Sequence, residues 1–243
     1  MKLAEMTWPE VGALSRDTVV VIPTGSLEQH GPHLPLFTDS ILATAVSEAV
    51  ERQIGDKVLL TPTLWLGASG HHLPFPGSLS NSMEGYYEAL RAVVTSLHRH
   101  GFWKFYVVNG HGGNTSPNDM ALRKLKETHP NLLIGAVGYF QFCTEECAAL
   151  MEGPAKSIQH ACEAEASLMM HVRPELVRVG KLRDDGLAAQ VPGMVHLFDE
   201  ITEEGSKGYA TLANADKGAK LFDAAVNGLC EALGTLYSGY RLG

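Results

Sequence analysis

The stretch TVVVIPTGSLEQHGPHLPLFTD, residues 18–39, joins a predicted strand to a rigid loop and to the start of a helix. Its β-branched opening run is typical of a strand buried inside a sheet. Three prolines and two glycines between positions 23 and 39 restrict the backbone and so fix where the side chains point. The potential metal ligands in this stretch are Glu28, His30, His33 and Asp39. We therefore expect a preorganised site for a divalent metal of the Zn, Mn or Fe type.

A purely structural explanation exists for each of these residues taken singly. Asp39 in a first helical turn would complement the helix dipole, and His30 could hydrogen-bond the loop. Glu28 and His30, however, are two positions apart, which in extended backbone places both side chains on one side. The density of ligand types in one rigid loop favours the metal site.

Strands and helices alternate along the rest of the chain. Strands are expected at 18–23, 57–62, 105–108 and 132–137, and helices at 38–53, 82–100, 117–129, 159–172 and 213–236. We expect Thr38 to be the N-cap of the first helix. A loop rich in Gly, His and Pro covers 67–80, and a polar stretch at 184–209 is interpreted as a long surface excursion. This alternation predicts an α/β fold with a mostly parallel sheet, helices on both faces, and a single domain over residues 1–243.

The amino-acid composition restricts which macromolecular partners and which cellular compartment we expect for this protein. Lys and Arg number 19 against 27 Asp and Glu, a formal charge of −8, which argues against nucleic acid or an anionic membrane as the main partner. The N-terminal residues lack the apolar run of a signal peptide, and no stretch approaches the roughly 20 apolar residues of a membrane span. The four cysteines show no disulfide spacing, so we expect free thiols and a cytoplasmic protein.

A second candidate segment is Asn109-Gly-His-Gly-Gly-Asn114, which follows the strand expected at 105–108. Its glycines permit a sharp turn and leave room beside His111, so Gly112 is expected to border the substrate. The segment has neither a P-loop lysine nor a dinucleotide fingerprint, so a ligand or catalytic histidine is favoured over phosphate binding. Because sites in parallel sheets form at the carboxyl ends of strands, this loop should meet the one that holds Glu28. His72, in the glycine-rich loop at 67–80, could fold over both and contact the substrate.

A third candidate segment is His160-Ala-Cys-Glu-Ala-Glu-Ala-Ser-Leu-Met169. On a continuous helix His160 would share a face with Glu163, whereas Glu165 would lie elsewhere. If the helix begins after His160, the histidine can reach the cleft and Glu165 supplies a second carboxylate. A solvated glutamate pair with a capping histidine is the structural alternative, and spacing alone leaves the three possibilities open.

At these places together the chain resembles the creatininase family of metal-dependent amidohydrolases. The matching segments are Gly25-Ser-x-Glu-Gln-His-Gly-Pro-His-x-Pro-x-x-x-Asp39, Phe75-Pro-Gly-Ser78, Asn109-Gly-His-Gly-Gly-Asn114 and His160-x4-Glu165-x-Ser-Leu-Met. The resemblance implies a three-layer α/β/α fold, a pair of divalent metal ions (Zn or Mn, with Fe as an alternative) and homo-oligomers, often hexamers. It also implies a catalytic role for His160 and these metal ligands, with Asp39 bridging: Glu28, His30, Asp39, His111 and Glu165.

Two departures from the family pattern bear on the substrate. Creatininase has a metal-binding glutamate near the end of the loop that here holds Gly113. The tryptophans that flank its substrate ring correspond to Phe140 and Lys156, so Phe140 is the expected aromatic contact and creatinine is a doubtful substrate.

The resemblance implies hydrolysis of a small-molecule amide at a non-peptide, often cyclic, C–N bond. Metal-activated water would attack, and His160 would give a proton to the leaving nitrogen at an ordinary histidine pKa of about 6.5. Enzymatic alternatives are a deformylase or a peptidase that trims a small modified peptide. An alternative of another class is a non-catalytic binding or assembly protein stabilised by a closed metal site.

Overall fold

The computed structural model describes residues 1–239, and its main sheet has four parallel strands in the order β2-β1-β3-β4. The strands are β1 (Val19–Thr24), β2 (Val58–Leu60), β3 (Lys104–Asn109) and β4 (Leu133–Gly138). In the register of the sheet, Thr24 pairs with Asn109 and Asn109 with Gly138. The carboxyl ends of three strands therefore lie level with one another, and the loops that follow them start at the same edge of the sheet.

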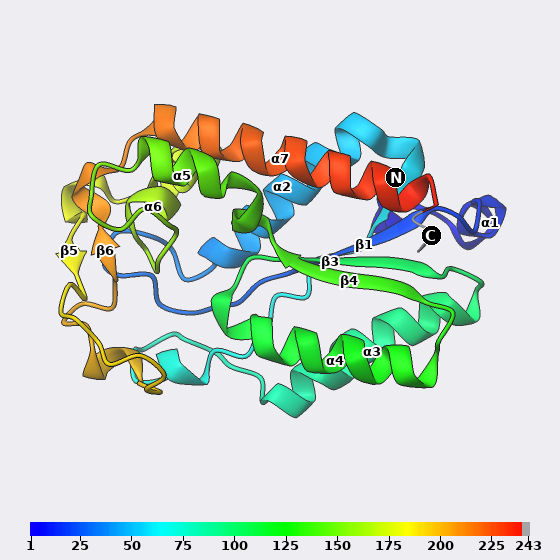
Figure 1. Ribbon diagram of the computed structural model, residues 1–243, viewed down its shortest axis with the longest axis horizontal. Coiled ribbons are helices and arrows are strands. Elements are labelled where there is room, and N and C mark those ends of the chain that lie inside the picture. Colours follow the sequence, from blue (N-terminus) through cyan, green and yellow to red (C-terminus); the bar gives the residue numbers. More distant parts are fainter. Residues whose placement is uncertain (240–243) are drawn as a thin grey trace.

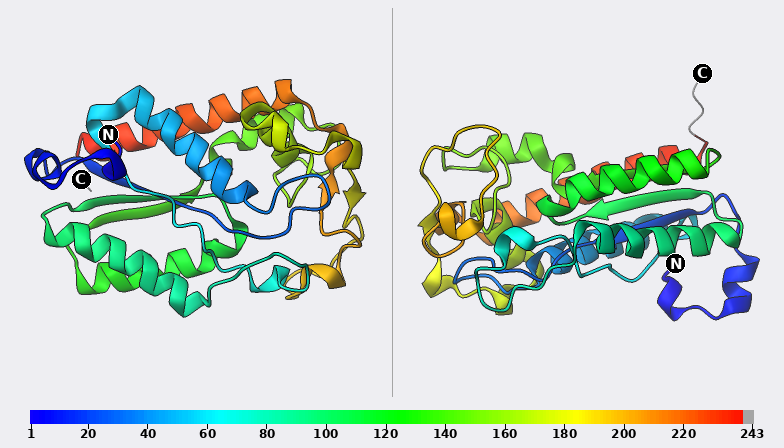
Figure 2. Two further views of the ribbon diagram at one scale, coloured as in Figure 1. Left: turned by 180° about the vertical axis from the view of Figure 1, so that it is seen from behind. Right: turned by 90° about the horizontal axis from the view of Figure 1, so that it is seen from below.

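Helices cover both faces of this sheet (Figures 1 and 2). Helices α2 (Thr38–Ile54) and α7 (Ala215–Tyr237) lie on one face, and α3 (Met83–Arg99) and α4 (Thr115–Thr128) on the other. Helix α6 (Glu163–Val172) packs against α7 at the carboxyl-end side of the strands. The predicted three-layer α/β/α architecture with a mostly parallel sheet is confirmed.

The core explains why β1 is a run of β-branched residues. Val19 and Val21 belong to the cluster packed against α2 and α7, whereas Val20 and Ile22 belong to the cluster packed against α3. All four are at most 1% exposed. A strand buried on both faces needs apolar side chains at every position, and this is the pattern that identified it in the sequence.

The structure differs from the sequence prediction at several element boundaries. Short helices α1 (Trp8–Ala13) and α5 (Thr144–Leu150) were not predicted, because six or seven residues give too little periodicity. The N-cap of α2 is Phe37, and Thr38 is already helical, with its hydroxyl donating to the Pro35 carbonyl at 2.7 Å. The N-cap prediction for Thr38 is therefore wrong.

The polar stretch at 184–209 is a long excursion, as predicted. It contains only the two-residue strands β5 (Asp184–Asp185) and β6 (Gly208–Tyr209), which pair antiparallel, and a 3-10 turn at Phe198–Glu200. It lies at the carboxyl-end side of the sheet (Figure 1). Among residues 1–239, no helix is both long enough and apolar enough to cross a membrane.

Candidate metal centre

The candidate site lies where loops from three distant parts of the chain converge at the carboxyl ends of β1 and β3. The loop after β1 carries Glu28 and His30, and Asp39 follows in the first turn of α2. The loop after β3 carries His111. A Cβ on Gly110 would lie 2.5 Å from the main-chain oxygen of Asp39, so this glycine is what permits the close approach of the two segments.

Asp39 lies between two imidazoles. Its Oδ1 is 3.1 Å from His30 Nε2, and its Oδ2 is 3.0 Å from His111 Nδ1. The Ser26 hydroxyl donates to Oδ2 at 2.6 Å. Each carboxylate oxygen thus faces a different histidine, an arrangement that suits a carboxylate shared between two cations.

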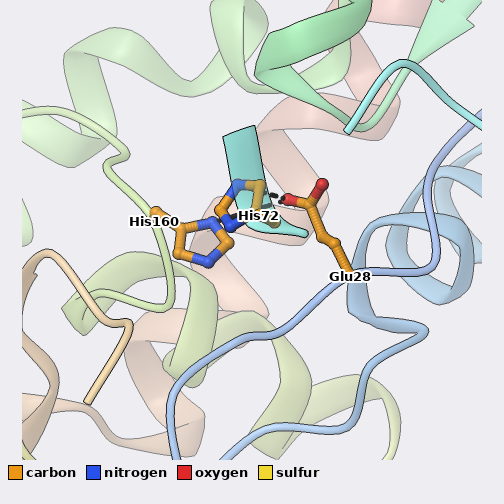
Figure 3. A group of neighbouring side chains, drawn as sticks. All are labelled: Glu28, His72 and His160. Carbon is orange, nitrogen blue, oxygen red and sulfur yellow. Dashed lines mark ion pairs between the residues drawn. The ribbon is translucent and has the colours of Figure 1, made fainter. Parts of the chain in front are cut away.

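Glu28 lies beside three imidazoles, of which Figure 3 shows those of His72 and His160. Its Oε1 is 3.1 Å from His72 Nε2, 3.2 Å from His111 Nδ1 and 3.7 Å from His160 Nδ1. Both carboxylate oxygens are nevertheless fully buried without a hydrogen bond of acceptable geometry. A buried carboxylate without hydrogen bonds is costly, and a cation among these ligands would remove that cost. The residues present therefore fit a divalent metal.

Helix α6 begins at Glu163, after His160, and this decides the question that spacing left open. Glu165 Oε2 lies 3.9 Å from His30 Nε2 and accepts a hydrogen bond from the Ala161 amide at 2.5 Å. Glu163 points elsewhere, to Lys217 Nζ at 2.6 Å. The backbone at Ala161 is left-handed, with φ of 49°, so the chain turns sharply between His160 and the helix.

Gln29 organises the neighbouring imidazoles. Its Nε2 donates to the Gly205 carbonyl at 2.8 Å and to His72 Nδ1 at 2.9 Å, and its main-chain oxygen lies 2.8 Å from His160 Nε2. Since His72 Nδ1 accepts, its hydrogen is on Nε2; since His160 Nε2 donates, its Nδ1 keeps a free lone pair on the side of Glu28.

Burial and charge shift the pKa values of these groups in opposite directions. Burial alone would lower the pKa of His30, but Asp39 and Glu165 raise it to about 10. Burial likewise opposes the charge of His111, yet Glu28 and Asp39 hold its pKa well above the ordinary value. The pKa of His160 is well below its usual range, because the imidazole is largely buried, with 13% of the side chain exposed, and lies against that of His30. His160 is therefore neutral in this arrangement, which corrects the expectation of an ordinary histidine pKa.

The pKa values of the two carboxyl groups Glu165 and Asp39 are also shifted in opposite directions. Burial raises the pKa of Glu165 to about 7, with Asp39 and Glu28 adding to the rise. Burial would also raise the pKa of Asp39, but the imidazoles of His30 and His111 hold it well below the ordinary value. Without a metal, protons on His30 and His111 take the place of cations.

Metal affinity is consequently expected to rise with pH. His30, with a pKa of about 10, holds a proton at neutral pH, and Glu165, with a pKa of about 7, is partly protonated there, so the metal must displace protons from both. Each proton released strengthens binding by about tenfold per pH unit. Zinc titration of the EDTA-treated protein against a chromophoric chelator at pH 6, 7 and 8 measures this. The His129→Ala variant serves as a control for histidines outside the site, and an affinity independent of pH would contradict the assignment.

The three residues predicted to contact the substrate, His72, Gly112 and Phe140, lie in different surroundings. His72 is buried against Glu28, closer to the ligand cluster than the sequence indicated, and Gly112 is exposed with open space beside it. Phe140 is not brought to the cluster: its ring packs on Gly138 and Tyr139 and lines a separate groove. His33 also points away, toward the Ala161 carbonyl at 2.8 Å.

The aromatic side chain beside the imidazoles is Phe198, from the excursion at 184–209. Its ring centroid lies 4.1 Å from that of His72 and 4.7 Å from that of His160. The apolar sequence around Phe198 suits either a subunit interface or a substrate pocket, and the structure places the ring against the imidazoles. At Gly113 a Cβ would lie 2.3 Å from His111 Nε2 and 2.8 Å from the His71 ring, so a histidine occupies the space beside that glycine.

Gly205 joins the excursion to this site and provides a stability prediction. Its φ is +90°, and a Cβ would lie 2.0 Å from Gln29 Oε1. Gly193, with φ of +81° and no atom within 4 Å of a Cβ, is a matched control. Backbone strain should cost each alanine variant about 1–3 kcal/mol, and Gly205→Ala should lose more because it also displaces Gln29. Urea unfolding compares the two variants, and equal losses would show that the Gln29 contact contributes nothing.

Comparison with known proteins gives a consistent result. The family model for creatininase (creatinine amidohydrolase) matches residues 4–233. A mycofactocin precursor peptide peptidase of Mycobacterium ulcerans (strain Agy99) is 32% identical over 236 residues, covering 91% of this chain and 83% of the relative. A creatinine amidohydrolase of Pseudomonas putida is 28% identical over 251 residues and covers 95% of both chains.

Solved structures agree with the sequence comparisons. The structure of creatinine amidohydrolase (creatininase) superposes with a TM-score of 0.86 at 29% identity and covers 98% of both chains. A Zn-Zn form of a mutant creatininase and a Mn form also superpose with a TM-score of 0.86, at 27% and 28% identity, and each covers 98% of this chain. They cover 98% and 99% of their own chains, respectively. With the family model matching nearly the whole length and the fold shared throughout, this chain belongs to the creatininase family.

Proposed function

We propose that this protein hydrolyses a non-peptide amide C–N bond, in a cyclic or otherwise small amide, at a centre of two divalent metal ions. The observation that carries the proposal is the pair of buried carboxylates. Glu28 lies among three imidazoles without a hydrogen bond of acceptable geometry, and Asp39 turns one oxygen toward His30 and the other toward His111. We assign Glu28, Asp39 and His111 to one cation and His30, Asp39 and Glu165 to the other. The first set is one of the candidate ligand groups, the second shares His30 and Glu165 with another, and Asp39 joins that second set through its 3.1 Å contact with His30. The Zn-Zn and Mn forms of similar creatininases support either metal.

When bound, the metals supply Lewis acidity, which lowers the pKa of a water and polarises the substrate carbonyl. The chain's own residues manage the protons. His160 is neutral, with its Nε2 hydrogen held by the Gln29 carbonyl and its Nδ1 lone pair free. It accepts the proton of the attacking water on Nδ1 and returns that proton to the leaving nitrogen. The main-chain carbonyl of Gln29 keeps this tautomer of His160 in place, and Phe198 restricts solvent over the imidazole faces.

A metal analysis combined with a hydrolysis screen tests the proposal. The screen covers creatinine, other lactams, formamides and short peptides, before and after EDTA, with add-back of Zn or Mn. Hydrolysis that disappears with EDTA and returns with metal, while circular dichroism stays unchanged, supports the proposal. Unfolding in EDTA with no hydrolysis of any amide by the metal-replete protein would instead indicate a structural metal site.

A peptidase is the second candidate. It is favoured by the 32% identity to a mycofactocin precursor peptide peptidase and by apolar side chains on the excursion next to Phe198. Val191, Met194 and Val195 are 60–93% exposed, a surface that suits an apolar peptide more than a small polar ring. Turnover of short peptides without turnover of lactams would select this candidate.

A further inference from the structure

His33 is a potential ligand of the loop after β1 that takes no part in the proposed metal centre. Its side chain is fully buried, and its Nδ1 has no hydrogen-bond partner within residues 1–239. Its Nε2 lies 2.8 Å from the Ala161 carbonyl oxygen, and since a carbonyl can only accept, this nitrogen donates. A second hydrogen on Nδ1 would be buried without an acceptor, so the ring is the neutral tautomer. Its single N–H is directed at one main-chain group, 128 positions away.

The main-chain group that His33 contacts belongs to an unfavourable turn. Ala161 has a φ of 49°, and it is the one non-glycine residue in the left-handed region among residues 1–239. A residue with a Cβ loses free energy in this region, so the turn persists only where the surrounding structure holds it. Ala161 is also fully buried, and the hydrogen bond from His33 is made to its carbonyl. His33 is therefore placed to stabilise the turn.

This turn connects two residues of the metal centre. His160 precedes Ala161, and its carbonyl accepts a hydrogen bond from the Lys207 amide at 2.7 Å. Glu165 follows in the first turn of α6, and its Oε2 accepts from the Ala161 amide at 2.5 Å. The two peptide groups of Ala161 thus have separate partners: the amide orients a carboxylate ligand, and the carbonyl is held by His33. A change of φ at Ala161 would rotate the amide away from Glu165.

The His33 ring is itself held by the loop that carries the ligand His30. A Cβ on Gly31, whose φ is +60°, would lie 3.0 Å from His33 Cε1, so the ring packs directly over that glycine. The main-chain oxygen of His33 accepts from the Arg178 amide at 2.9 Å. His33 therefore ties the loop of His30 to the segment of Glu165. These two ligands are assigned to the same cation, and their nearest ligand atoms are 3.9 Å apart.

We propose that His33 is a positioning residue of the metal centre, which acts by holding the Ala161 turn in place. The turn fixes Glu165 against the cation that it shares with His30. The inference rests on the proposed two-metal function. Groups that orient a metal ligand without touching the metal usually change its affinity by about 10–100-fold when they are replaced. If His33 only filled space in the core, its replacement would change stability and leave the metal centre as it is.

Two amide variants test whether the donor at the Nε2 position matters. His33→Gln can bring its NH₂ group to that position, whereas His33→Asn is one methylene shorter and leaves the Ala161 carbonyl unpaired. His33→Asn should weaken binding of the second zinc ion by about tenfold or more, and His33→Gln should lose much less. Zinc titration of the EDTA-treated protein against a chromophoric chelator at fixed pH measures both. Equal affinities in the two variants would overturn the proposal.

The matched control is a histidine with the same kind of hydrogen bond outside the centre. His98 Nδ1 lies 2.9 Å from the Phe102 carbonyl oxygen. His98→Ala removes this bond and should leave the affinity for both zinc ions unchanged, even where it lowers stability.

Relief of the backbone strain tests the turn itself. Glycine enters the left-handed region without a steric cost, so Ala161→Gly added to His33→Asn should recover about threefold or more of the lost zinc affinity. An unchanged affinity would show that His33 does not act through the turn. If His33→Asn alone does not fold, the double variant is compared with wild type, and it should bind the second ion within about tenfold. A double variant that binds one ion or stays unfolded refutes the positioning role.

Cobalt(II) provides a readout that packing alone would not change, because its visible absorption depends on the ligands around the ion. At saturating cobalt the spectrum of His33→Asn should differ from that of wild type, and that of His33→Gln should not. A wild-type protein that binds no second ion would end the proposed function and this inference with it. A wild-type protein that binds two ions, with the same affinities and spectrum in His33→Asn, would end this inference alone.

Discussion

Replacing Asp39 by alanine is expected to remove the bound metal and reduce hydrolysis by about 10³-fold or more, since Lewis-acid catalysis contributes several kcal/mol and each 1.36 kcal/mol is a factor of ten. The size of the effect follows from the position of the residue. Its two oxygens face His30 and His111, at 3.1 and 3.0 Å, and it is the residue through which the two assigned ligand sets meet. Its loss would also leave those imidazoles without their nearest carboxylate.

The measurement combines metal content by mass spectrometry with turnover on the substrate that the screen identifies. Asp39→Asn separates the effect of charge from that of size. The amide keeps the volume of the side chain, but it removes the negative charge and turns an NH₂ group toward one imidazole. This variant should therefore also lose metal. Asp56→Ala, an exposed carboxylate outside the site, is the matched control. An Asp39→Ala enzyme that keeps both its metal and its activity would rule out the shared-ligand role.

Replacing His160 by alanine should lower the hydrolysis rate by about 10²–10⁴-fold, the usual contribution of a positioned proton-transfer group. Metal content should stay largely intact. The prediction depends on the free Nδ1 lone pair, on the low pKa of the residue and on its partial exposure, which together allow it to exchange a proton with water or substrate.

This variant also decides between two roles. His160 Nδ1 lies 3.7 Å from Glu28 Oε1, and His160 forms one candidate ligand group with Glu28 and another with His30 and Glu165. If His160→Ala loses metal to the same extent as Asp39→Ala, the residue is a ligand and the proton carrier must be sought elsewhere. His100→Ala provides the comparison for a histidine outside the cluster.

The sequence predicted those parts of the site whose signal is local. Glu28, His30 and Asp39 share a rigid loop and a helix start, and the resemblance placed Glu165 among the ligands; the structure brings all four together. The strands were found because β1 and its neighbours are apolar at nearly every position, which only a strand covered on both faces requires.

Other parts depended on long-range packing that local patterns do not encode. Phe140 was expected beside the substrate from a loose alignment, but its ring packs on Gly138, and Phe198, 58 positions further along the chain, lies against the imidazoles instead. Gln29 was passed over because a glutamine between ligands has no chemistry of its own. Its importance comes from partners at His72, His160 and Gly205, up to 176 positions away.

The ligand cluster and its cover come from separate stretches of chain. Ligands sit on short loops anchored to strands and helices, whereas Phe198 and the Gly205 carbonyl belong to an excursion with almost no regular structure. Mutations in the excursion can therefore accumulate and reshape the entrance without disturbing the ions beneath. This separation would allow the metal centre to stay unchanged during evolution while the substrate changes. It agrees with the comparison above, in which one relative is named for a peptide substrate and another for creatinine.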